Sequence, residues 1–108
     1  MVAMTVVELA AHLQVDIDHV RAMVKEGRLL ALKDASGRTA VPVEQLDGTE
    51  PVKHLPAVLT LLRDASYSAD ESWQWLNDAD DSLPGTPLQA LHENRASEVK
   101  RRAQALGF

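Results

Sequence analysis

The sequence contains no cysteine and few aromatic residues. Without cysteine the chain can form no disulfide, no zinc–thiolate site and no cysteine nucleophile. Aromatic residues make up 4% of the chain, and with small helices they give little material for enclosing a substrate pocket of ordinary size. No apolar run approaches the roughly 20 residues that a membrane-spanning helix needs. The composition predicts a small globular protein that does not enter a membrane.

Motifs for catalysis, cofactors and metals are also missing. The sequence has no phosphate-binding glycine loop, no Gly-x-Ser-x-Gly, no His-Glu-x-x-His and no dinucleotide fingerprint. Its four histidines are far apart, and the acidic run from Asp78 to Ser82 lacks the glycine and glutamate offsets of a calcium loop. The first residues, MVAMTVVELAAHL, lack the basic region and cleavage site of a signal peptide. We therefore predict a cytoplasmic protein that is not an enzyme and holds no cofactor and no metal.

The charge is distributed unevenly. The net charge of −5 opposes nucleic-acid binding, because the usual footprint of such a protein is a basic domain. However, all the basic residues among residues 1–49 fall between Arg21 and Arg38, whereas most of the acidic ones lie outside that window. A locally positive surface is thus compatible with an acidic protein.

The first quarter of the chain has the pattern of two short helices joined by a tight turn. Thr5 and Glu8 have the spacing of a capping box, and apolar residues then recur at helical intervals up to Leu13. Asp16 is suited to begin a second helix, which we expect to end at Gly27. The arrangement predicts a helix-turn-helix.

A β-hairpin is predicted next. The apolar residues 29–32 and the segment 39–41 flank a polar turn with Ser36 and Gly37 near its tip, and Pro42 is expected to stop the second strand. Residues 43–46 favour a short helical turn, and residues 47–51 have the composition of a linker.

The remainder of the chain is predicted to be helical. Pro56 suits a first helical turn, Ser68 and Glu71 form a second capping box, and Thr86-Pro87 begins a further helix. The last helix is expected over residues 96–106. Trp73 and Trp75 are two residues apart and cannot both face inward, so we expect Trp73 to pack in the core and Trp75 to be partly exposed.

These elements predict a mainly α fold with a small β-hairpin wing: a winged helix-turn-helix followed by a helical C-terminal domain. We place the headpiece at residues 1–49 and the helical domain, packed on it, at residues 50–108. The headpiece alone has few apolar residues, so we expect the two to share one core.

The segment from Val20 to Lys33, then a wing, then Val41-Pro42, resembles the headpiece of the excisionase/MerR-like family. The whole chain, with Lys53–Leu59 after the headpiece and Ala96–Ala105 at the end, resembles small actinobacterial winged helix-turn-helix DNA-binding proteins. The resemblance implies that the second helix enters the major groove of double-stranded DNA and that the wing lies on the DNA backbone.

A separate resemblance covers residues 72–106. Trp75-Leu76, Gly85-Thr86-Pro87-Leu88 and Val99 are similar to the toxin-binding domain of Xre/MbcA/ParS-type antitoxins. This likeness implies a protein interface that includes Trp75, Gly85, Thr86 and Pro87, and it keeps open a second function, that of an antitoxin- or adaptor-like module with a protein partner.

The DNA-binding interpretation assigns contacts to one set of side chains. They are the exposed cations and the histidine of the second helix and the wing: His19, Arg21, Lys25, Lys33 and Arg38. For each of these residues the alternative is that it is an ordinary solvated surface residue without a DNA contact. On the DNA-binding interpretation the protein is a transcriptional regulator or a nucleoid-associated factor.

Overall fold

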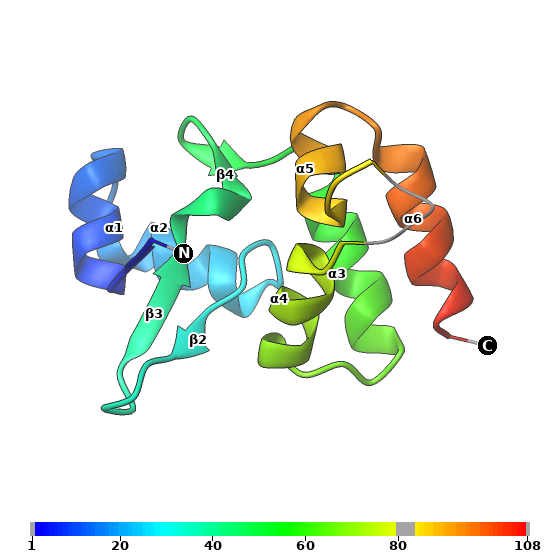
Figure 1. Ribbon diagram of the computed structural model, residues 1–108. Coiled ribbons are helices and arrows are strands. Elements are labelled where there is room, and N and C mark those ends of the chain that lie inside the picture. Colours follow the sequence, from blue (N-terminus) through cyan, green and yellow to red (C-terminus); the bar gives the residue numbers. More distant parts are fainter. Residues whose placement is uncertain (1, 80–83, 108) are drawn as a thin grey trace.

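The computed structural model describes residues 2–79 and 84–107, and most of the acidic run predicted at residues 78–82 lies outside this range. Two groups of elements follow one another along the chain, an α/β half (residues 2–51) and a helical half (residues 52–107) (Figure 1). The elements, in chain order, are β1 (Ala3–Met4), α1 (Val6–Leu13), α2 (Ile17–Lys25), β2 (Leu32–Lys33), β3 (Thr39–Pro42), the 3-10 turn η1 (Val43–Gln45), β4 (Leu46–Asp47), β5 (Glu50–Pro51), α3 (Leu55–Asp64), α4 (Ala69–Asn77), α5 (Pro87–His92) and α6 (Ala96–Ala105).

The predicted helix-turn-helix is formed by α1 and α2. The capping box of α1 is present in full: the Thr5 hydroxyl accepts from the Glu8 amide, and the Glu8 carboxylate accepts from the Thr5 amide. Gln14 ends α1 in the left-handed conformation, with φ of 59°, and this reverses the chain within three residues. Gly27, with φ of 76°, follows the end of α2, as expected of a glycine just past a helix terminus.

The wing belongs to a three-stranded antiparallel sheet in the order β1-β3-β2. Leu32 pairs with Ala40 and Lys33 with Thr39, so the hairpin strand begins later than the predicted residue 29. Pro42 ends β3 while pairing with Ala3 of β1. The β1 strand was not predicted, because a two-residue strand is too short for any alternation of apolar and polar residues to show.

The segment predicted as a linker is instead a small hairpin. Leu46 pairs with Pro51 and Asp47 with Glu50, and Gly48 turns the chain with φ of 66°. The Val52 amide then donates to the Gln45 carbonyl oxygen at 2.9 Å. This hairpin therefore connects the two halves by ordered backbone.

The first three helices of the helical half begin where the sequence predicts. Pro56 lies in the first turn of α3, and capping boxes begin α4 at Ser68 and α5 at Thr86. The expectation for the tryptophans was wrong: Ser72 and Leu76 are the buried residues of α4, and Trp73 and Trp75 both pack half-buried at its edges. Ser72 and Leu76 thus form the inner face of α4, and both indoles pack on the helical cluster beside it.

The residues that the structure describes form two hydrophobic clusters and not the single shared core that we expected. The cluster of the α/β half includes Leu9, Val20, Met23, Leu29 and Val41. The cluster of the helical half is formed by other apolar residues: Val52, Leu55, Val58, Leu59, Leu62, Leu76, Leu88, Ala90, Leu91, Ala96, Val99 and Ala103. The α/β half obtains its own core because β1, α1, α2 and β3 close around these side chains.

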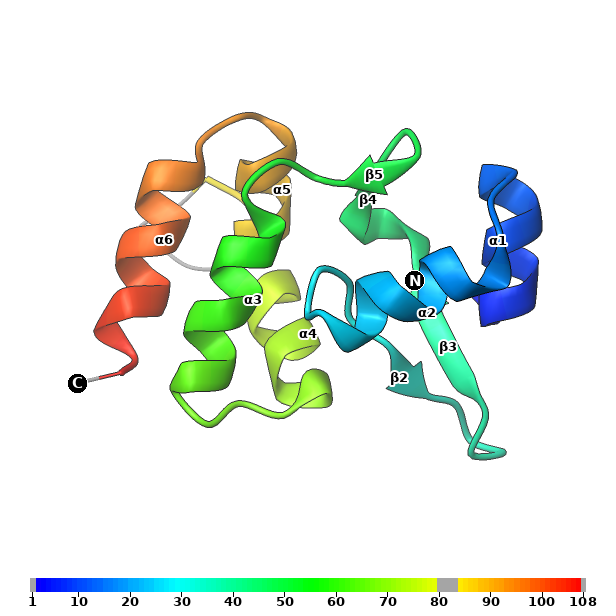
Figure 2. The same cartoon turned by 180° about the vertical axis from the view of Figure 1, so that it is seen from behind.

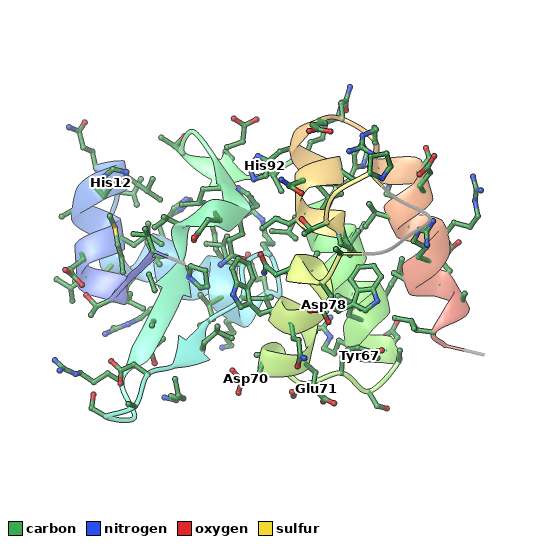
Figure 3. The ribbon with its side chains drawn as sticks, viewed as in Figure 1. His12, Tyr67, Asp70, Glu71, Asp78 and His92 are labelled. Carbon is green, nitrogen blue, oxygen red and sulfur yellow. The ribbon has the colours of Figure 1, made fainter. Side chains whose placement is uncertain are left out.

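The two halves lie one after the other along the long axis of a molecule that measures 37 × 26 × 22 Å (Figures 1 and 2). Leu30 of the α/β half packs against the helical cluster. His92 projects from α5 toward the α/β half (Figure 3), where its Nε2 lies 2.6 Å from the Glu44 carbonyl oxygen. None of the helices in the described ranges is long and apolar enough to cross a membrane.

Candidate nucleic-acid interface

The outer face of α2 carries most of the side chains that the sequence singles out. Val20 and Met23 are buried against α1 and the sheet, and this fixes the rotation of the helix. His19, Arg21 and Lys25 are consequently exposed, with Arg21 and Lys25 adjacent on one strip of the helix and His19 on another. The structure thus brings three of the five predicted DNA-contact residues together on one helix.

Arg21 is held only loosely by its neighbour. Its Nη1 lies 3.9 Å from Asp18 Oδ1, and the two side chains are 68% and 94% exposed. An exposed pair at this distance contributes little to stability. The guanidinium can therefore leave Asp18 for a stronger anionic partner such as a phosphate, with which it can form paired hydrogen bonds.

The tip of the wing is ordered by one carboxylate. Asp34 Oδ1 accepts hydrogen bonds from the Ser36 amide at 2.9 Å, the Ser36 hydroxyl at 2.7 Å and the Arg38 amide at 2.9 Å. The Ser36 hydroxyl and the Arg38 amide, donating in this way, lower the pKa of Asp34. Gly37 completes the turn with φ of 82°, so the wing has a defined shape despite its exposure.

Two cations flank that turn, as predicted. Lys33 Nζ donates to the Thr39 hydroxyl at 3.3 Å, and Arg38 Nε donates to the Ser36 hydroxyl at 3.2 Å. Arg38 is also 4.0 Å from Asp34 Oδ2 while its side chain is 76% exposed. Both cations are exposed at the wing and rest on weak polar contacts that a phosphate can replace.

Acidic residues lie close to this basic set. Asp16 is the residue before α2, but its side chain forms none of the capping hydrogen bonds expected from the sequence. Asp18 is exposed in the first turn of α2, and Glu26 is exposed directly after its last residue. Their negative charge weakens the positive potential around Arg21 and Lys25, so phosphate attraction at this face is reduced.

Arg28, another basic residue of this region, is paired with acidic side chains and so differs from the exposed cations. Its Nη2 donates to Glu50 Oε2 at 3.2 Å, and its Nη1 lies 4.0 Å from Glu26. Glu50 belongs to the β4–β5 hairpin, which the sequence did not predict. The hairpin thus supplies the carboxylate that forms an ion pair with the Arg28 guanidinium.

The residues predicted as a protein interface have structural roles of their own. Thr86 accepts from the Gln89 amide in the capping box of α5, and Pro87 is buried in its first turn. Gly85 adopts φ of 81°, and a Cβ there would meet Gln89 Oε1. Trp75 packs half-buried on the helical cluster. The similarity to a toxin-binding loop is thus largely explained by the start of a helix.

The histidines lie apart from this face, with the exception of His19. His54 Nδ1 lies 2.9 Å from Lys100 Nζ, and desolvation together with the nearby cations Lys100 and Lys53 lowers the pKa of His54. Within the described residues, no three His, Asp or Glu side chains come together as a metal site would require.

Sequence reasoning missed a buried polar contact beside the boundary between the two halves. Gln45 is fully buried, its amide nitrogen donates to the Leu30 carbonyl at 2.8 Å, and its amide oxygen accepts from the Leu30 amide at 2.8 Å. A glutamine in a short helical turn gives no sign of this role, because its partner is fifteen residues away.

Known proteins match both halves of the chain. A family model described as "Rv2175c C-terminal domain of unknown function" matches residues 52–107. A curated protein of Mycobacterium tuberculosis, named DNA-binding protein Rv2175c, is 35% identical over 112 residues, which cover 93% of this chain and 77% of that protein. The NMR structure of Rv2175c superimposes with a TM-score of 0.86 at 32% identity, covering 99% of this chain and 82% of that one. The chain therefore belongs to the Rv2175c family, and residues 52–107 are its C-terminal domain.

Proposed function

We propose that the protein binds double-stranded DNA, with α2 in the major groove and the β2–β3 wing along the backbone. The observation that carries this proposal is the joint exposure of Arg21 and Lys25 on α2 and of Lys33 and Arg38 on the wing. A helix presenting such side chains fits the width of the major groove, and wing cations suit phosphates. The name of the related DNA-binding protein Rv2175c supports the same function.

The architecture supports a finer proposal. A two-helix unit followed by a wing, as in excisionase/MerR-like headpieces, serves a transcriptional regulator or a nucleoid-associated factor acting in the cytoplasm. Arg21 on the exposed face of α2 suits contact with base edges, His19 can reach them from another side of the helix near its start, and Lys33 and Arg38 suit phosphates. Sequence preference on this proposal comes from α2, and most of the affinity from the cations.

The second candidate function, a protein-interaction module, rests on the helical half. The partly exposed Trp73 and Trp75 favour it, because large aromatic side chains at a surface are typical of protein interfaces. Against it, Thr86 and Pro87 are used inside the fold. We therefore place DNA binding first.

Fluorescence anisotropy of a labelled random duplex, measured across a series of salt concentrations, tests the proposal. Contacts from Arg21, Lys25, Lys33 and Arg38 to about three to five phosphates give a log–log slope of affinity against salt of about −3 to −5. Micromolar affinity is expected for non-specific duplex, because Asp16 and Asp18 oppose the attraction.

The double variant Arg21→Gln/Arg38→Gln should weaken binding and make the slope shallower by about two. Arg101→Gln, which removes an exposed cation of α6, is the matched control and should leave binding unchanged. No binding at low salt, or binding unaffected by the double variant, would overturn the DNA function and favour the protein-interaction module.

A further inference from the structure

Arg63 belongs to the helical half, yet its guanidinium lies against the end of α2. Its Nη1 is 3.0 Å from the position that a Cβ on Gly27 would occupy. Arg63 also lines, together with Val24, Gly27 and Leu59, a cavity of about 210 Å³ between the two halves. Seen from behind, the cyan end of α2 points toward α3 and α4 (Figure 2). The absence of a side chain at Gly27 makes this close approach possible.

The charge of Arg63 is not used by the fold. The side chain is exposed, and among residues 2–79 and 84–107 it has neither a carboxylate within 4.0 Å nor a side-chain hydrogen bond. Nearby Arg28, by contrast, is bound to Glu50 at 3.2 Å. The carbonyls at the end of α2 are also occupied, since those of Ala22 and Met23 accept from the Glu26 and Arg28 amides.

Helix geometry relates the residues that Arg63 contacts to the outer face of α2. Arg21 and Lys25 are four residues apart and neighbours on the helix surface, and Val24 lies three residues after Arg21 on the adjoining strip. Because Arg63 lines a cavity with Val24 and Gly27, it lies at the carboxyl end of α2, beside the strip that adjoins Arg21 and Lys25. Lys25 likewise forms none of the ion pairs found among the described residues.

We propose that the C-terminal domain takes part in DNA binding through Arg63, which contacts a backbone phosphate beside the major groove that α2 enters. This inference rests on the proposed function. It gives the helical half a direct role: the domain extends the row of Arg21 and Lys25 by one cation that the α/β half cannot supply. The contact is to phosphate, so it adds affinity without adding sequence preference.

The test compares Arg63→Gln and Arg63→Lys with the wild-type full chain, using anisotropy on random duplex over a salt series. Arg63→Gln should lower the affinity about five- to tenfold near 50 mM salt and make the log–log slope shallower by about one. Arg63→Lys keeps the charge and should retain the slope. Arg101→Gln on α6 serves as the control for loss of an exposed cation.

Thermal melts of the same variants separate contact from structure. If Arg63 only compensates the negative end of the α2 dipole, Arg63→Gln will lower Tm and leave the slope unchanged, which overturns the inference. An unchanged affinity for Arg63→Gln, with Arg21→Gln/Arg38→Gln still weakened, overturns it too while leaving the proposed function standing. Absence of binding by the wild-type chain would instead remove the proposed function itself.

Discussion

The side chain of Gln45 pairs with the backbone of Leu30 as a neighbouring strand would. Its amide group donates to the Leu30 carbonyl and accepts from the Leu30 amide, each at 2.8 Å, and it is fully buried. Leu30 in turn packs against the cluster of the helical half. Gln45 therefore holds in place a residue of the α/β half that contacts the helical half, and both hydrogen-bonding groups of its own amide are matched.

Gln45→Leu keeps the approximate volume but leaves both backbone groups of Leu30 without their partner. An unsatisfied buried polar group costs about 1–3 kcal/mol, so we expect the free energy of unfolding to fall by at least that amount. Urea unfolding measures it. Gln74→Leu, the same change at an exposed position of α4, should stay within about 0.5 kcal/mol of wild type; equal effects of the two variants would contradict the role of Gln45.

Gly85 and Gly37 provide a matched pair for separating backbone strain from steric clash. Both have φ near 80°, but a Cβ at Gly85 would meet Gln89 Oε1, whereas nothing lies within 4 Å of a Cβ at Gly37. Gly37→Ala should therefore cost about 1–2 kcal/mol from the left-handed conformation alone. Gly85→Ala should cost about 1 kcal/mol more, because displacing Gln89 disrupts the capping box of α5.

Thermal and urea unfolding of both glycine variants measure the difference. If Gly85→Ala is no worse than Gly37→Ala, the contact between Gly85 and Gln89 makes no contribution to the start of α5. Because Gly37 lies on the wing, its variant also reports whether an altered turn affects DNA binding.

The sequence predicted features that depend on residues close together in the chain, and it missed those that depend on distant residues. The capping boxes at Thr5, Ser68 and Thr86 were predictable because all their groups lie within four residues. The strand β1 and the β4–β5 hairpin were not, because strands of two residues carry no periodicity. Leu30 at the boundary between the clusters shows why one core was expected: apolar residues do not reveal which neighbours they will meet.

The candidate site shows the same division. Helical periodicity accounts for the buried inner face of α2, formed by Val20 and Met23, and for the exposure of Arg21 and Lys25 on its outer face. It gave no indication of Arg63, whose approach to Gly27 depends on how the two halves pack. Contacts between distant segments depend on tertiary structure, which a local sequence pattern does not reveal.

Folding should become less favourable as His54 is protonated. Desolvation, Lys100 and Lys53 lower its folded-state pKa below the ordinary 6.5, so the unfolded chain binds more protons than the folded one below that pH. The stability that neutral His54 contributes is complete above pH 6.5, and it is lost as the pH falls toward the lowered pKa of His54 in the folded state. His54→Asn should reduce this slope, since Asn does not titrate and tolerates the left-handed conformation of His54, with φ of 73°.

Urea unfolding of wild type and His54→Asn between pH 5 and 7.5 measures that slope, above the range in which carboxylates such as Glu71 titrate. The pKa of Glu71 is itself lowered by hydrogen bonds from Ser68, so its contribution is lost only at lower pH. An unchanged slope in His54→Asn would assign the pH dependence to other groups.

Asp18 stands in the most direct opposition to DNA binding, because it is exposed on α2 and lies 3.9 Å from Arg21. Asp18→Asn removes a negative charge from the proposed interface and frees the guanidinium, so we expect tighter binding of random duplex at low salt, with a gain that shrinks as salt screens the repulsion. The folded state should lose about 0.3–1 kcal/mol, because Asp18 is in the first turn of α2, where the helix dipole favours an acid.

Glu98→Gln is the matched control: Glu98 is an exposed acid in the first turn of α6, so it should show a similar loss of stability without a gain in affinity. Anisotropy at two salt concentrations and a thermal melt give both quantities, and equal affinity gains for the two variants would mean that net charge, and not the face of α2, governs DNA binding.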